Sequence, residues 1–228
     1  MARIARSAFA EFIGTALLLA AVVGSGIMGA KLSGGNDALA LLANAIATGG
    51  ALVALIGALG PVSGAHFNPA VTVFEFLRAQ ISWARAIVYV AAQIAGAISG
   101  VVLAHAMFNL RLIQQSGHVR ATTGEMVGET VATFGLLLTI WGVARSKPDA
   151  VPYAVASFIV GAYWFTSSTS FANPAVTVAR ALTDTFSGIA PASVLGFVLA
   201  QSLAVVIAIA AARALSEVPD PSRPSNER

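Results

Sequence analysis

The pentapeptide Asn-Pro-Ala-Val-Thr occurs twice in the chain, at Asn68–Thr72 and at Asn173–Thr177. Asn is a favoured N-cap residue and Pro a favoured first residue of a helix, so each copy predicts a helix start. The Asn side chain also carries an amide NH₂ group, which can donate hydrogen bonds to a passing oxygen. One copy alone is equally well explained as a plain helix start. Two copies in an apolar chain indicate a binding site or pore where the two halves meet.

Two acidic residues also lie inside apolar segments, Glu11 and Glu129. Acids at membrane depth are rare and usually functional, and in a proton-coupled transporter they relay protons. Two glutamines in other apolar segments, Gln93 and Gln201, are most simply hydrogen-bonding contacts between spans. An ion-coupled secondary transporter is therefore an alternative to a pore.

Long apolar segments are the elements that must position these residues. Of the 228 residues, 57% are hydrophobic and 10% are charged, and the mean hydropathy is +0.81. A soluble domain cannot cover that much apolar surface. Each segment approaches or exceeds the ~20 residues that cross a hydrocarbon core of ~30 Å, so we expect an all-α membrane protein. The six predicted spans are 8–30, 37–59, 83–106, 123–143, 151–169 and 191–213.

Charge and composition exclude several other classes of protein function. The pI is near 9.8, but six spans would place nine basic residues on the side of the N-terminus and four on the other. Because cytoplasmic loops are enriched in Lys and Arg, we expect both termini in the cytoplasm and no nucleic-acid partner. The chain has no cysteine, which excludes disulfides and thiolate metal sites. No nucleophile–base pair or phosphate loop is visible, so we expect no enzyme and no cofactor.

The chain divides into two halves with the same plan. Each half has a glutamate in its first span, the pentapeptide after its second and an Ala-Gln pair in its third. Three spans per half would make the repeats inverted. Each segment after Asn-Pro is too short to cross a bilayer and is predicted to be a half-helix. We expect one channel domain, 1–215, with repeats at about 8–108 and 123–213, and a disordered cytoplasmic tail at 216–228.

This arrangement resembles the aquaporin or major intrinsic protein family over essentially the whole chain. The resemblance implies an aquaporin-like fold of six transmembrane helices and two half-membrane helices. It also implies a homotetramer in the lipid bilayer, with one pore per subunit for small neutral solutes and no metal. Glu11 and Glu129 would then be structural, accepting hydrogen bonds from the loop before each half-helix. The motif residues are Asn68, Pro69 and Ala70 in one half and Asn173, Pro174 and Ala175 in the other.

The resemblance also assigns the lining of the pore. Two half-helix N-termini, each with roughly half a positive charge, would face its centre and disfavour cations. The amides of Asn68 and Asn173 would donate to the solute there. Phe171 departs from the family, where a small residue is usual. The backbone carbonyls expected along the pore are those of Gly64, Ala65 and His66 in one half and of Thr169, Ser170 and Phe171 in the other.

This chain differs most from the family at the selectivity filter. The family usually carries an arginine three places after the second motif Asn, and here that residue is Val176. Counting from the motifs without gaps places the other filter residues at Thr48, Gly161 and Ser170. Loss of the arginine and small neighbours predict a wide filter. Arg180, one helical turn farther, is expected in the outer vestibule; the alternative is that it folds back to replace the arginine.

A wide filter with valine in place of arginine is similar to bacterial aquaporins associated with arsenic resistance. We therefore expect a channel in a bacterial inner membrane for arsenite, antimonite, glycerol and water. Arsenite is an uncharged trihydroxide at neutral pH, similar to glycerol in size. The alternatives are a plain water or glycerol channel, an ion-coupled secondary transporter and a junction protein with negligible permeability.

Overall fold

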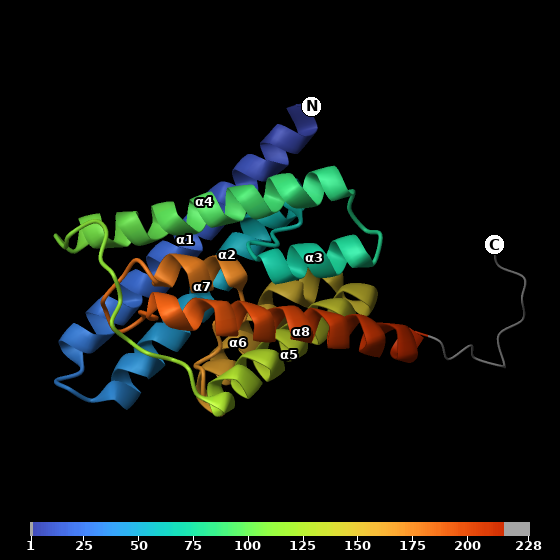
Figure 1. Ribbon diagram of the computed structural model, residues 1–228. Helices are drawn as coiled ribbons and strands as arrows, with labels where there is room; N and C mark the ends of the chain where they lie inside the picture. Colours follow the sequence, from blue (N-terminus) through green and yellow to red (C-terminus); the bar gives the residue numbers. More distant parts are fainter. Residues whose placement is uncertain (1, 217–228) are drawn as a thin grey trace, which may run out of the picture.

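Eight α-helices form the described part of the chain, residues 2–216, in the computed structural model (Figure 1). No β-strand occurs within that range. The predicted tail at 216–228 lies outside the described residues, apart from Ser216. The helices are α1 (Ala2–Leu32), α2 (Asp37–Ser63), α3 (Pro69–Leu77), α4 (Trp83–Met107), α5 (Thr123–Ser146), α6 (Val151–Phe165), α7 (Pro174–Arg180) and α8 (Pro191–Ser216), and a 3₁₀ turn, η1 (Pro148–Ala150), precedes α6.

Five of the described helices, α1, α2, α4, α5 and α8, are long and apolar enough to cross a membrane. They cover five of the six predicted spans. The prediction of a span at 151–169 was wrong at its end, because α6 stops at Phe165 and has 15 residues. At ~1.5 Å per residue that helix is about 22 Å long. Farther along, the backbone N–H groups of Phe171 and Ala172 bond to the Glu129 carboxylate.

Local sequence signals explain several helix ends. The side chain of Asn36 accepts a hydrogen bond from the backbone N–H of Leu39 and caps α2. Gly64 ends the same helix with a φ of 92°, a left-handed conformation that glycine adopts without a Cβ clash. Thr122 and Glu125 bond each other's backbone N–H groups in a capping box at the start of α5.

Two glycines let α4 pack directly against α1. A Cβ atom on Gly96 would lie 2.3 Å from the carbonyl oxygen of Phe12, and one on Gly100 would lie 2.2 Å from that of Ala16. Small residues allow such close approach between membrane helices, where packing rather than the hydrophobic effect holds neighbours together. The α1–α4 contact fixes Glu11 of α1 beside Gln93 of α4.

The two short helices, α3 and α7, lie end to end in the middle of the bundle (Figure 1). Their N-terminal ends meet, because Asn68 before α3 bonds the loop before α7, and Asn173 before α7 bonds the loop before α3. The long helices pack around this pair. Each short helix is preceded by an irregular segment, 64–68 before α3 and 166–173 before α7. These segments are called the α3 loop and the α7 loop below.

Candidate functional site

Both motif asparagines cap the helix that follows them. The Oδ1 of Asn68 accepts a hydrogen bond of 2.8 Å from the backbone N–H of Ala70. The Oδ1 of Asn173 accepts bonds from Ala175, at 3.0 Å, and from Val176, at 3.3 Å. The proline after each Asn is the first helical residue, where its missing N–H leaves no helical hydrogen bond unmade. The expected helix starts are therefore in place.

The amide nitrogens of the same two asparagines join the loops to each other. The Nδ2 of Asn68 donates to the carbonyl oxygen of Ala172 at 2.7 Å, and the Nδ2 of Asn173 donates to that of Phe67 at 2.8 Å. An amide NH₂ group has two donor hydrogens. One hydrogen on each asparagine is thus engaged across the loops, and the other has no hydrogen-bond partner among residues 2–216.

Glu11 organises the α3 loop. Its Oε1 accepts hydrogen bonds from the Ser63 hydroxyl at 2.6 Å and from the backbone N–H of His66 at 3.0 Å. Its Oε2 accepts bonds from the backbone N–H of Phe67 and from Nε2 of Gln93, both at 2.7 Å. The side chain is completely buried. Four donors around one carboxylate hold it in place as a structural acceptor.

Glu129 does the same for the α7 loop. It accepts hydrogen bonds from the backbone N–H of Phe171 at 2.8 Å and of Ala172 at 2.9 Å. Nε2 of Gln201 donates to it at 2.6 Å and also to the Thr177 hydroxyl at 2.9 Å. Sequence reasoning had treated the glutamines only as general contacts between spans. The signal for this specific role was the recurrence of Ala-Gln at a similar distance after each motif.

Both loops contain non-glycine residues with positive φ. Ala65 and Ser170, each three residues before the motif Asn, have φ values of 48° and 53°. Phe67 and Ala172, each one residue before it, have values of 50° and 48°. Such left-handed conformations cost energy for residues with a Cβ, and they recur where the surrounding structure holds the chain in place. The carboxylates of the two glutamates supply that restraint.

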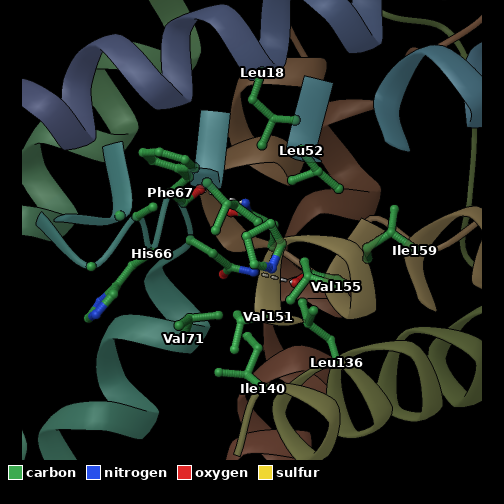
Figure 2. Close-up of a pocket in the computed structure, with 18 of the residues that line it drawn as sticks. Leu18, Leu52, His66, Phe67, Val71, Leu136, Ile140, Val151, Val155 and Ile159 are labelled. Atoms are coloured by element: carbon green, nitrogen blue, oxygen red, sulfur yellow. Dashed lines mark hydrogen bonds between the residues drawn. The ribbon is translucent and has the colours of Figure 1, made fainter. Parts of the chain in front are cut away.

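A cavity of about 830 Å³ runs past both asparagines. Apolar side chains of Leu52, Val155 and Ile159 surround part of it, with Val71 on the side of the α3 loop (Figure 2). The ring of His66 points away from these side chains in the same view. That ring bonds Thr72 and packs edge-on against Tyr89, so His66 reaches the cavity through its backbone. The other expected lining residues found there are Gly64, Ala65, Ser170 and Phe171, whereas Thr169 is not among them.

Three of the four expected filter residues line this cavity: Thr48, Ser170 and Val176. Gly161 does not, and a Cβ built on it would contact the Phe165 ring, which is exposed on the outside of the bundle. Residues 159 and 163 share a helix face, and residue 161 lies on the opposite one. Tyr163 lines the cavity in its place, with its hydroxyl 3.3 Å from that of Thr48. The count from the motif does not register which face of α6 is turned toward the cavity.

Arg180 lies in the wall of the cavity and not in an open vestibule. Its side chain is 3% exposed, and its Nε donates to the carbonyl oxygen of Ser187. The guanidinium lies 3.4 Å from the centre of the Phe171 ring, which also packs edge-on against Phe197 at 5.1 Å. Arg180 is therefore buried and lines the same cavity as Val176, the residue four places before it. Phe171, the unusual aromatic, is the surface on which the guanidinium rests.

Comparisons with known proteins agree with this geometry. Residues 1–168 match the family model described as major intrinsic protein. Aquaglyceroporin AqpS of Rhizobium meliloti (strain 1021) is 51% identical over 96% of this chain and 92% of its own length. Aquaporin-5 of Rattus norvegicus is 37% identical over 62% of this chain and 54% of its own length.

A solved structure has the same fold. The X-ray structure of the aquaglyceroporin from Plasmodium falciparum superposes with a TM-score of 0.74, covering 96% of this chain and 98% of that one, at 18% identity. The family match, the AqpS similarity and the apolar helices together identify an integral membrane protein. The chain belongs to the major intrinsic protein family, and it is a membrane channel and not an enzyme.

Proposed function

We propose that the protein is a passive channel for water, glycerol and the neutral trihydroxides of arsenic and antimony. The observation that carries the proposal is Val176, which lines the cavity where the family usually has an arginine. A valine makes that part of the wall apolar and leaves room that an arginine side chain would fill. Similarity to an aquaglyceroporin supports glycerol as one solute.

The polar groups along the cavity can form hydrogen bonds with hydroxyl-bearing solutes that pass through it one after another. One free N–H on each of Asn68 and Asn173 donates to a solute oxygen in the middle of the path. The Thr48 and Tyr163 hydroxyls offer donors and acceptors beyond it. Two helix N-termini at the meeting point of α3 and α7 favour oxygen lone pairs over cations. A solute held there by two donors cannot readily pass a proton along.

The proposal includes the topology and assembly expected from the sequence. We place α6 as the sixth membrane crossing, with α1–α4 and α5–α8 as inverted repeats and Asn68 and Asn173 at the midplane. Six crossings put both termini on one side, and the distribution of Lys and Arg favours the cytoplasm. The bacterial relative supports an inner-membrane location. A homotetramer remains part of the proposal on family resemblance alone.

Solute flux into proteoliposomes tests the function directly. Water, glycerol, urea and arsenite fluxes are measured for the wild type, for Val176→Arg and for Val176→Ala as a matched control. Val176→Arg should lower glycerol and arsenite flux by about tenfold and water flux by less than about threefold, because the arginine narrows the path. Val176→Ala should pass glycerol at least as fast as the wild type.

Three outcomes would count against the proposal. Wild-type water flux without glycerol or arsenite flux would overturn the solute range. Equal losses of water and glycerol flux in a folded Val176→Arg would remove Val176 from the filter. Flux that saturates and depends on a proton or sodium gradient would favour a transporter. Against a transporter stands Glu11, whose carboxylate is fully hydrogen-bonded and so is not free to relay protons.

A further inference from the structure

Arg180 is a buried cation that no carboxylate neutralises. Its side chain is 3% exposed, at the C-terminal end of α7. Among residues 2–216, the ion pairs are Arg78 with Glu75 and His118 with Asp184, and neither involves Arg180. A buried charge without a partner is strongly unfavourable unless something else solvates it. The open space beside Arg180 is the cavity that it lines.

Two contacts hold the guanidinium at that wall. Its Nε donates to the Ser187 carbonyl oxygen, and one face lies on the Phe171 ring. Ser187 is itself fixed, since its hydroxyl donates to the carbonyl of Val22 in α1 at 3.2 Å. The two terminal amino groups of Arg180 have no hydrogen-bond partner among the described residues. Those groups are available to solutes in the cavity.

Other polar side chains line the same cavity as these amino groups. Thr48 and Tyr163 bring their hydroxyl groups to the same cavity, 3.3 Å apart. Ser170 also lines it, but its hydroxyl oxygen is buried and has no hydrogen-bond partner among residues 2–216. Val176 precedes Arg180 by four residues and so lies on the same face of α7. Its short side chain fills little of the space beside the guanidinium.

We propose that Arg180 is the charge-selecting residue of the channel and that Val176 separately sets its width. The usual filter arginine performs both tasks from one position. Here the positive charge lies one helical turn farther along α7, on the Phe171 ring, so it repels cations without narrowing the path at Val176. Its terminal amino groups then bind the oxygens of neutral polyols and trihydroxides. This inference rests on the proposed function, since it assigns a role within that channel.

The test separates charge selection from solute size. Purified full-length protein in proteoliposomes is assayed for K⁺ leak under a KCl gradient and for glycerol uptake in the same preparation. Arg180→Met removes the charge but keeps a long side chain; Arg180→Gln also removes it but keeps an amide that can reach the Ser187 carbonyl. Arg180→Lys retains the charge. Arg120→Met is the matched control, because Arg120 contacts the same Phe171 ring, at 5.2 Å, but does not line the cavity.

We expect K⁺ leak to rise by about tenfold or more in Arg180→Met and Arg180→Gln, with glycerol uptake changed by less than about threefold. Arg180→Lys and Arg120→Met should both leak K⁺ as slowly as the wild type. Two neutral variants of Arg180 are tested so that the comparison still holds if one of them fails to fold. Unchanged K⁺ leak in the neutral variants, or an equal rise in Arg120→Met, would overturn the assignment while wild-type glycerol uptake persists. Absence of wild-type glycerol uptake would instead overturn the proposed function and this assignment with it.

Discussion

The α3 loop and the α7 loop share one backbone design but differ in the side chains that surround it. Counted from each motif Asn, the positive φ values, the two N–H groups bound by a glutamate and the cross-loop amide bond occupy the same positions. A glutamine joins the glutamate to a threonine in the following helix in both halves. We call these shared backbone conformations and hydrogen bonds the common frame. It fixes the path of the backbone, and the side chains outside it determine which solutes each half can select.

The first difference is at the position two residues before the Asn, which is His66 in one loop and Phe171 in the other. Each ring packs edge-on against an aromatic residue four places before the glutamine: Tyr89 at 5.4 Å and Phe197 at 5.1 Å. His66 also bonds the Thr72 hydroxyl at 3.0 Å, whereas Phe171 has no polar atom. The apolar ring of Phe171 can instead support a cation.

The second difference is the place of the arginine. Arg85 donates to the Tyr89 hydroxyl at 2.6 and 2.9 Å and does not line the cavity. Phe197, which replaces Tyr89 in the other half, has no hydroxyl to hold such a group. Arg180 lies on Phe171 and lines the cavity. Arg120 lies behind the α7 loop as Arg85 lies behind the α3 loop, so the difference is the additional cation, Arg180, in the cavity wall.

The largest test of the common frame is removal of its carboxylates. Glu11→Ala leaves four buried donors without an acceptor and Glu129→Ala leaves three. Each unpaired buried group costs about 1–3 kcal/mol, so we expect the free energy of unfolding to fall by about 4 kcal/mol or more in each variant. Thermal unfolding in detergent, followed by tryptophan fluorescence, measures the loss.

Glu125→Ala is the control for that series, since Glu125 is only partly buried in the capping box of α5. Its loss should cost about 1 kcal/mol. A cost for Glu129→Ala no larger than that of Glu125→Ala would show that the glutamate does not support the α7 loop.

Sequence reasoning located the common frame because its signals are local and repeated. The two Asn-Pro-Ala-Val-Thr copies mark the helix starts, and Glu11 and Glu129 stand out as charges in apolar segments. A helix cap, a proline and a buried acid each have few structural roles, so these residue types restrict the structures that the sequence can adopt. The structural role expected for both glutamates matches the hydrogen bonds found.

The side chains around the frame were harder to predict, because they depend on long-range geometry. Gly161 and Tyr163 lie on opposite faces of α6, and which of them faces the cavity depends on how that helix is rotated against its neighbours. The position of Arg180 depends on Phe171 and Ser187 meeting it in space. The cross-loop bonds of Asn68 and Asn173 span 104 and 106 residues, so no local pattern announces them.

An intermediate effect is expected from a charge at the junction of the two loops. Asn173→Asp keeps the cap on α7 but cannot donate to the Phe67 carbonyl, and it adds a negative charge beside two helix N-termini. We expect K⁺ conductance in planar bilayers to rise by about threefold to tenfold, because a carboxylate attracts cations. Asn68→Asp should give a rise of similar size, since its bonds are equivalent.

Asn173→Ala separates the two causes, because it breaks the bond to Phe67 without adding charge. Its K⁺ conductance should stay near that of the wild type. An equal rise in Asn173→Ala and Asn173→Asp would mean that loosening the loops, and not the carboxylate, admits the ion.

The smallest effect concerns the left-handed residues, where the two loops should behave alike. Ala65 and Ala172 both have a φ of 48°, and Ala79, in the turn after α3, has a φ of 59°. Replacing each by glycine relieves roughly 1–2 kcal/mol of backbone strain but increases the entropy of the unfolded chain by a similar or smaller amount. We expect a rise of about 1–3 °C in the apparent Tm of each variant. Ala79→Gly lies outside both loops and measures the backbone effect alone. The contrary outcome is a fall in Tm for Ala65→Gly and Ala172→Gly with a rise for Ala79→Gly. It would show that the two loops need their alanine methyl groups for packing. Side-chain contacts would then hold the common frame in place together with the glutamates.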